Sequence, residues 1–220
     1  MTPKNFLLSA LITFASAAMT LGQEQNKESN EAAYTRVVNE RAAKIVATLN
    51  LSDPKQSTRV QEAIAQQYKR LNTLHESRKQ ELATLTETDK KEAVETETAS
   101  KLASLHKDYL TALAHELTPQ QIEQVKDGMT YGVLPITYKG YQAMLPDLTN
   151  EQKGQILTYL TEARERAMDE GSSKEKHAMF GKYKGRINNY LSAAGIDMKK
   201  ASKDWEERIA KEKEADKSRK

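Results

Sequence analysis

The chain has 220 residues, of which 30% are charged, with a formal net charge of +3 at pH 7 and no cysteine. The absence of cysteine excludes disulfides, lipoprotein attachment and thiol chemistry. Outside residues 174–186 basic side chains are balanced by acids, so the charge pattern excludes a nucleic-acid-binding footprint.

Residues 1–22 have the composition of a secretory signal peptide. Lys4 precedes an apolar run from Phe6 to Leu21, and cleavage is expected after the small residue Gly22, with Ala17 and Ala18 as alternatives. The alternative, a membrane anchor, needs about 20 apolar residues, and this run is shorter and interrupted by serine and threonine. We therefore expect a secreted or periplasmic protein that is not membrane-embedded after the signal is removed.

The first half of the remaining chain is predicted to form long helices. Residues 23–29 are polar and are expected to be a linker, and apolar spacings of three and four then predict a helix over 30–49. Two more apolar stripes predict helices over about 54–85 and 89–116. The latter two are expected to pair as an antiparallel hairpin, so residues 30–116 form the long-helix part.

After Leu117 the composition changes, because eight of the nine glycines lie at or beyond Gly128. Shorter helices are expected here, over about 119–127, 136–144, 150–170 and 173–194. Gly128, Gly171 and Gly195 are predicted to end helices in the left-handed conformation, and Pro135 is predicted to hold Leu134 extended.

No useful strand alternation occurs, so the fold class is all-α. One helical domain is expected over 30–205, made of the long helices and a compact Tyr/Gly-rich lobe over 117–205. Residues 206–220 are rich in Lys and Glu and are expected to be a solvated charged tail.

A short motif occurs twice, as Leu117-Thr118-Pro119-Gln120-Gln121 and Leu148-Thr149-Asn150-Glu151-Gln152, with a degenerate copy at residues 51–55. The motif has the pattern of a capping box. In a capping box the Thr hydroxyl accepts from the backbone N–H of the Gln, and the Gln side chain accepts from the backbone N–H of the Thr. The motif also resembles the LTxxQ motif of small helical periplasmic chaperones, which implies a client-binding role. The alternative is that the copies serve only as helix caps.

Residues 127–146 carry only two charges and contain three tyrosines, Tyr131, Tyr138 and Tyr141. One interpretation is a tight connector that plugs the end of a bundle. The other is a tyrosine-lined pocket, because tyrosine offers an apolar face and a hydroxyl that bonds when buried.

Residues 171–191 form a basic stretch predicted to be helical, with an apolar arc that includes Phe180, Tyr183, Ile187 and Leu191. One edge of that arc carries Lys182, Arg186 and Asn189, and the other carries His177 and Lys184. The lysines are also explained by a solvated face. An arginine beside an aromatic surface, however, suits a carboxylate or phosphate ligand, which it binds bidentately.

We therefore predict one ligand-binding site built from both stretches. The tyrosines would form one wall and the Arg186 edge the other, with His177 available as an acid or base. The predicted binding residues are Tyr131, Tyr138, Tyr141, His177, Lys182, Arg186 and Asn189.

No cofactor is expected, since phosphate-loop and dinucleotide motifs are absent from the sequence. No metal site is expected either, because the four histidines show no ligand spacing with one another.

The blocks DGMTYGVLPITYKGYQAMLPDLTNEQK and MDEGSSKEKHAMFGKYKGRINNYL resemble the signature blocks of a family of secreted bacterial proteins known only as a domain of unknown function. The resemblance covers residues 34–205. It implies an all-helical exported protein from bacteria that degrade complex glycans, and hence a role in polysaccharide utilisation. It assigns no catalytic residue.

Three functions follow from these observations. The first is a module that binds an anionic, sugar-derived ligand such as an acidic oligosaccharide. The second is an enzyme on acidic glycans, a lyase with a tyrosine or His177 as base and Arg186 neutralising the carboxylate. The third is a periplasmic chaperone-like client binder.

Overall fold

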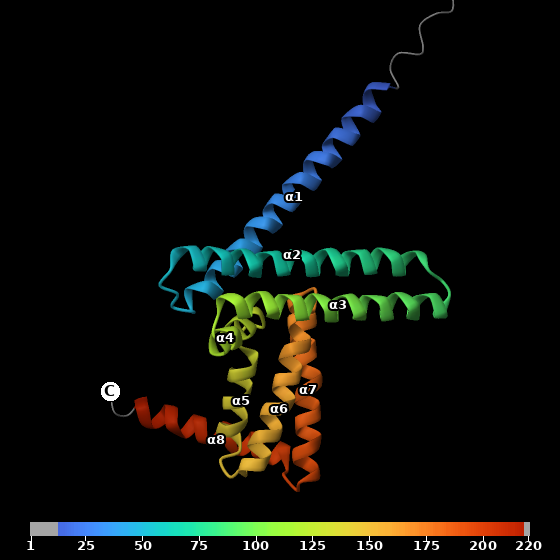
Figure 1. The fold of residues 1–220 in the computed structure, drawn as a ribbon. Helices are drawn as coiled ribbons and strands as arrows, with labels where there is room; N and C mark the ends of the chain where they lie inside the picture. The colour runs from blue at the N-terminus through green and yellow to red at the C-terminus, as the bar shows by residue number, and fades with distance from the viewer. Residues whose placement is uncertain (1–12, 218–220) are drawn as a thin grey trace, which may run out of the picture.

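A computed structural model describes the backbone of residues 13–217 and the side chains of residues 30–214. The described chain is all α-helical, which confirms the predicted fold class (Figure 1). Its helices are α1 (Thr13–Ala47), α2 (Pro54–Thr84), α3 (Thr88–Glu116), α4 (Pro119–Met129), α5 (Val133–Met144), α6 (Asn150–Met168), α7 (Ser173–Ala193) and α8 (Met198–Lys217).

The helices are arranged in two parts. α2 and α3 lie side by side as a long antiparallel hairpin, and the second half of α1 packs along α2 (Figure 1). α5, α6 and α7 stand roughly perpendicular to the hairpin as a three-helix lobe, α4 lies between the two parts, and α8 crosses the far end of the lobe (Figure 1).

Each part has its own apolar core. The first core joins α1, α2, α3 and α4 and receives Met168 from the end of α6. The second joins α5, α6 and α7. On α7 the predicted apolar arc is buried at Phe180, Tyr183, Ile187 and Leu191.

Both copies of the repeated motif are capping boxes, as predicted. The backbone N–H of Gln121 donates to the Thr118 hydroxyl (3.3 Å), and the Thr118 N–H donates to the Gln121 side chain (3.0 Å). The corresponding distances between Thr149 and Gln152 are 3.2 and 2.9 Å. The boxes start α4 and α6, so both motifs have a complete structural role.

The structure corrects one predicted segment. Residues 23–29, predicted as a linker, lie within α1, because the segment contains neither glycine nor proline to interrupt a helix.

The charged end of the chain belongs to α8. Its described side chains from residue 206 on are mostly exposed, as expected for a solvated segment, but Arg208 donates to the carbonyl oxygens of Ala143 and Met144 at 3.0 Å each. These carbonyls end α5, so Arg208 caps that helix and fastens α8 to it.

Two predictions about residues 127–146 are also wrong. Leu134 is helical, because Pro135 lies in the first turn of α5, where a missing N–H breaks no intrahelical bond. Gly128 does not end its helix in the left-handed conformation. It lies inside α4, where an added Cβ would come within 2.8 Å of Ile45, so glycine allows α1 and α4 to pack closely.

Gly171 likewise does not adopt the left-handed conformation predicted for it, whereas Gly195 does, with φ 85°. An added Cβ at Gly171 would approach the His75 ring to 2.9 Å. Gly171 therefore allows the α6–α7 turn to approach α2.

The predicted signal peptide lies outside the residues whose side chains are described. Among the described residues, no helix has the length and apolar composition needed to cross a bilayer.

Candidate functional site

The tyrosine segment meets α7 along a different edge from the one predicted. The Tyr141 hydroxyl donates to the Asn188 side chain at 2.7 Å and lies 3.4 Å from the Lys184 carbonyl oxygen. Tyr141 is buried, and burial raises its pKa to about 12. Its hydroxyl is therefore a neutral donor that fastens α5 to α7.

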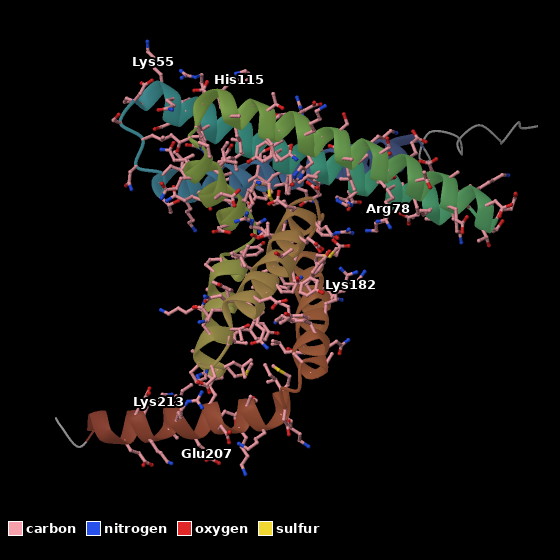
Figure 2. All side chains as sticks on the ribbon, turned by 60° about the horizontal axis from the view of Figure 1, so that its bottom comes forward. Lys55, Arg78, His115, Lys182, Glu207 and Lys213 are labelled. Atoms are coloured by element: carbon pink, nitrogen blue, oxygen red, sulfur yellow. The ribbon has the colours of Figure 1, made fainter. Side chains whose placement is uncertain are left out.

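Arg186 lies about 160° around the helix from Lys184 and Asn188. Its guanidinium is 3.8 Å from Glu162 on α6 and 4.8 Å from the centre of the Tyr183 ring. Lys182 projects from the outside of the lobe (Figure 2).

The predicted cleft between the tyrosine segment and the edge formed by Lys182, Arg186 and Asn189 is therefore not formed. α5 packs against the Lys184–Asn188 edge of α7, and Arg186 pairs with α6 instead. Tyr138 is partly buried against the core of the lobe. The sequence shows both edges of the apolar arc but not which neighbouring helix covers each edge.

Two of the predicted residues do come together. The rings of Tyr131 and His177 stack with centroids 5.3 Å apart and an interplanar angle of 16°. Tyr131 is 42% exposed and lies between α4 and α5. It thus brings an aromatic face from the tyrosine segment to the beginning of α7, at the end of the lobe nearest the hairpin.

The backbone of Tyr131 is strained. Its φ is 60°, and Gly132 follows with φ 64°. The left-handed conformation costs a residue with a Cβ about 1–2 kcal/mol, so glycine would suit position 131 better on conformational grounds. Such outliers occur preferentially at functional sites, which makes this exposed tyrosine a candidate binding residue.

Tyr131 borders two adjoining hollows where the hairpin part meets the lobe, here called the junction cleft. The hollows have volumes of about 450 and 240 Å³ and share Arg41, Tyr68 and Tyr131. The larger is lined by Arg41, Lys44, Ile45, Thr48, Tyr68, Gly128 and Tyr131. The smaller is lined by Tyr34, Arg41, Tyr68, Leu71, Tyr131, Glu170, Gly171, Ser172, Ser173 and Lys176.

The hairpin-side wall of the junction cleft is aromatic and basic. The Tyr34 hydroxyl donates to the Tyr68 carbonyl oxygen at 3.1 Å. Burial raises the pKa of Tyr34, and burial together with nearby Tyr131 raises that of Tyr68 to about 12. Both hydroxyls are therefore neutral near pH 7, and Arg41 adds an exposed guanidinium beside them.

The lobe-side wall carries two ionisable groups whose pKa values are displaced toward neutrality. Burial, followed by the charge of Glu175, raises the pKa of Glu170. Burial lowers the pKa of Lys176 to about 8. Groups displaced in this way are enriched at functional sites, and here both border the same cavity.

The α6–α7 turn that carries Glu170 is fixed to the hairpin by two histidines. His106 Nδ1 lies 2.9 Å from an Asp169 carboxylate oxygen, and His75 Nε2 lies 2.6 Å from the Asp169 carbonyl oxygen. Hydrogen bonds to Asp169 and Glu165 raise the pKa of His106 to about 9. The charged imidazole of His106 therefore fixes the α6–α7 turn, which forms one wall of the cleft, to the hairpin, which forms the other.

A second set of ion pairs supports the same junction through α4. Arg164, which is 3% exposed, donates to Asp127 at 2.8 Å and also bonds to Glu123. Lys126 lies 3.0 Å from Glu165. These pairs lock α6 to α4 beneath the cleft.

Tyr34, Arg41 and Tyr68 were missed from the sequence, and Lys176 was counted only as part of the basic stretch. One signal was present, because Tyr34 and Arg41 are seven residues apart and therefore share a helix face. No group of three or more His, Asp or Glu side chains suited to a metal ion occurs among the described residues.

A search of curated proteins finds no match to the chain. A family described as "Protein of unknown function (DUF3826)" matches residues 35–211. This range includes both sequence blocks that carry the resemblance and nearly coincides with the predicted span of 34–205. The match covers well over half of the chain, and the protein therefore belongs to the DUF3826 family.

Proposed function

We propose that the junction cleft binds a small anionic ligand that carries a ring, with a sugar acid as the simplest example. The observation behind the proposal is the convergence of Tyr34, Tyr68 and Tyr131 with Arg41 around one cavity. Aromatic faces provide contact area for a ring, and a guanidinium selects a carboxylate.

The charges that border the cleft favour an anion. Arg41 and Lys44 are exposed on α1 and both line the larger hollow. The acid in the lining is Glu170, which is partly buried. A carboxylate entering the cleft would therefore meet mainly basic side chains.

The biological setting is part of the same proposal. The signal-like residues 1–22 and the resemblance to exported proteins of glycan-degrading bacteria support an envelope or secreted protein. In that setting the ligand would be an acidic fragment released from a polysaccharide.

Isothermal titration calorimetry tests the proposal. D-glucuronate and D-galacturonate are expected to bind, and D-glucose and D-galactose are not. Arg41→Gln should weaken binding of the acids by about tenfold or more, the usual effect of losing a hydrogen bond to a charged group.

Arg186→Gln is the matched control, because Arg186 is an exposed arginine outside the cleft. It should leave the affinity unchanged. Loss of binding in Arg186→Gln but not in Arg41→Gln would reject the junction cleft, and equal binding of neutral sugars would reject anion selection.

An enzyme acting on acidic glycans is the second candidate. The raised pKa of Glu170 favours it, because an acid with a pKa nearer to neutrality transfers protons more effectively at pH 7. Ultraviolet absorbance of an unsaturated product, followed with acidic oligosaccharides, would detect lyase turnover.

The surface offers less support for a chaperone. The exposed large apolar side chains of the described residues are Tyr131, Ile136 and Leu157, and none lies on the long helices. Both capping motifs also have a structural role that needs no client.

A further inference from the structure

Lys176 is a feature of the junction cleft that anion binding leaves unexplained. Its side chain is 4% exposed and borders the smaller hollow. Nζ donates to the carbonyl oxygens of Ala167 and Met168, at 2.8 Å each. In the described part of the chain its hydrogen-bond partners are thus main-chain oxygens at the end of α6 and not a carboxylate.

The number of partners fits a neutral amine. A neutral amine has two N–H donors and one lone pair. The two carbonyl oxygens satisfy both donors, which leaves the lone pair for a reacting carbon.

The surroundings of Lys176 favour the same form. Burial, opposed by the charges of Asp169 and Glu170, lowers its pKa to about 8. The neutral form of Lys176 is therefore far more populated near pH 7.5 than that of an exposed lysine, whose ordinary pKa is about 10.4.

We propose that Lys176 forms a reversible imine with the carbonyl carbon of an anionic ligand held in the junction cleft. This inference rests on the proposed binding function and narrows it to ligands with a free aldehyde or ketone, such as the open-chain form of a sugar acid or a 2-keto acid. Desolvated lysines commonly react with carbonyl substrates in this way.

The chemistry needs no oxidant, reductant or cofactor. The Lys176 nitrogen attacks the carbonyl carbon, the C=O π bond breaks, and one proton passes from the nitrogen to the oxygen to give a carbinolamine. A second proton then reaches that oxygen, which leaves as water while the C=N bond forms, and the nitrogen loses its remaining proton to give the neutral imine. Glu170 borders the same hollow and is suited to supply and recover these protons, and hydrolysis reverses every step.

Reductive trapping tests the proposal. The purified protein is incubated at pH 7.5 with D-glucuronate or pyruvate and sodium cyanoborohydride, which reduces the imine to a stable secondary amine. Peptide mass mapping is expected to place the added mass on Lys176. Lys182 and Lys184, which are exposed on the same helix, are internal controls and should be labelled far less.

Lys176→Arg should abolish the trapped adduct, because arginine keeps a positive charge and hydrogen-bond donors but stays protonated. Mapping of the wild-type protein needs no variant, so a folding defect in Lys176→Arg cannot obscure the result. Labelling confined to surface lysines, or labelling of Lys176 that is no greater than theirs, would overturn the proposal.

Methyl glucuronide separates this inference from the proposed binding function, since its anomeric carbon is blocked and it cannot form an imine. If it binds calorimetrically but glucuronate leaves Lys176 unlabelled, the imine is wrong and the binding cleft stands. If neither acid binds and Lys176 is unlabelled, both proposals fail.

Discussion

Phe180, Tyr183 and Ile187 on α7 are each at most 1% exposed, whereas among residues 78–100 of the hairpin only Val94 and Thr98 are buried. No residue of 78–100 belongs to either apolar core. There, Arg78, which is labelled in Figure 2, donates two hydrogen bonds of 2.7 Å to Glu95 and so joins α2 to α3 at the surface. Surface ion pairs of this kind contribute little free energy.

The longer of the two parts is therefore not the better-packed one. The far half of the hairpin is a long, regular pair of helices with little buried area, and the lobe is a smaller unit with a dense core. The junction cleft lies where the two parts meet and is fixed by ion pairs as well as apolar contacts.

The largest difference is expected between a truncation in the core of the lobe and one in the far half of the hairpin. Phe180→Ala should lower the free energy of unfolding by about 3–5 kcal/mol, because it removes a fully buried ring. Leu82→Ala, at a half-buried hairpin position, should cost only about 1–2 kcal/mol. Chemical denaturation measures both, and equal costs would show that the hairpin is as well packed as the lobe.

The stability that the contact between the hairpin and the lobe provides should depend on pH. The folded-state pKa of His106, about 9, lies above its ordinary value of 6.5, so its contribution is fully present below about pH 6.5 and disappears as the pH rises through 9. After discounting for its partial exposure, His106→Gln should cost about 1–2 kcal/mol at pH 6.

Denaturation of wild type and His106→Gln at pH 6 and pH 10 checks this dependence. The two proteins should differ at pH 6 and converge at pH 10, while the effect of Phe180→Ala should be similar at both. A difference between wild type and His106→Gln that persists at pH 10 would show that the imidazole acts through packing rather than charge.

The two capping boxes should have smaller effects. Thr118→Ala and Thr149→Ala should each cost about 1 kcal/mol, because each removes the acceptor for a backbone N–H at the start of a helix. Neither should change affinity for a sugar acid. Unchanged stability combined with lost ligand or client binding would instead support a chaperone-like role for the motif.

The smallest change in stability is expected at the strained residue. Tyr131→Gly removes the cost of a left-handed tyrosine but loses the ring that stacks on His177. Stability should therefore change by no more than about 1 kcal/mol, while sugar-acid affinity falls. A large loss of stability with normal affinity would mean that Tyr131 is a packing residue.

Most of the helices could be predicted from the sequence, because their evidence is local. Apolar periodicity places α2 and α3 within about two residues of their ends, and the Thr118 and Thr149 caps mark where α4 and α6 begin. The roles of Gly128 and Gly171 cannot be predicted locally. Each glycine makes room for a side chain that is distant in sequence, Ile45 for Gly128 and His75 for Gly171.

The site was only partly predictable for the same reason. Tyr131 and His177 were predicted and lie together, but Arg186 faces another helix. Tyr34 and Tyr68 join the cleft because α1 and α2 pack beside the α4–α5 turn. No periodicity within one helix reveals which of its edges a distant helix will cover.

In the proposed function, the ligand contacts the tyrosines of the junction cleft and not those along α5. Nuclear magnetic resonance of protein labelled at tyrosine, titrated with D-glucuronate, tests it directly, with single Tyr→Phe variants assigning the signals. The signals of Tyr34, Tyr68 and Tyr131 should shift, and those of Tyr138 and Tyr141 should not. Shifts confined to Tyr138 and Tyr141, or no shift at any tyrosine at saturating ligand, would contradict the account.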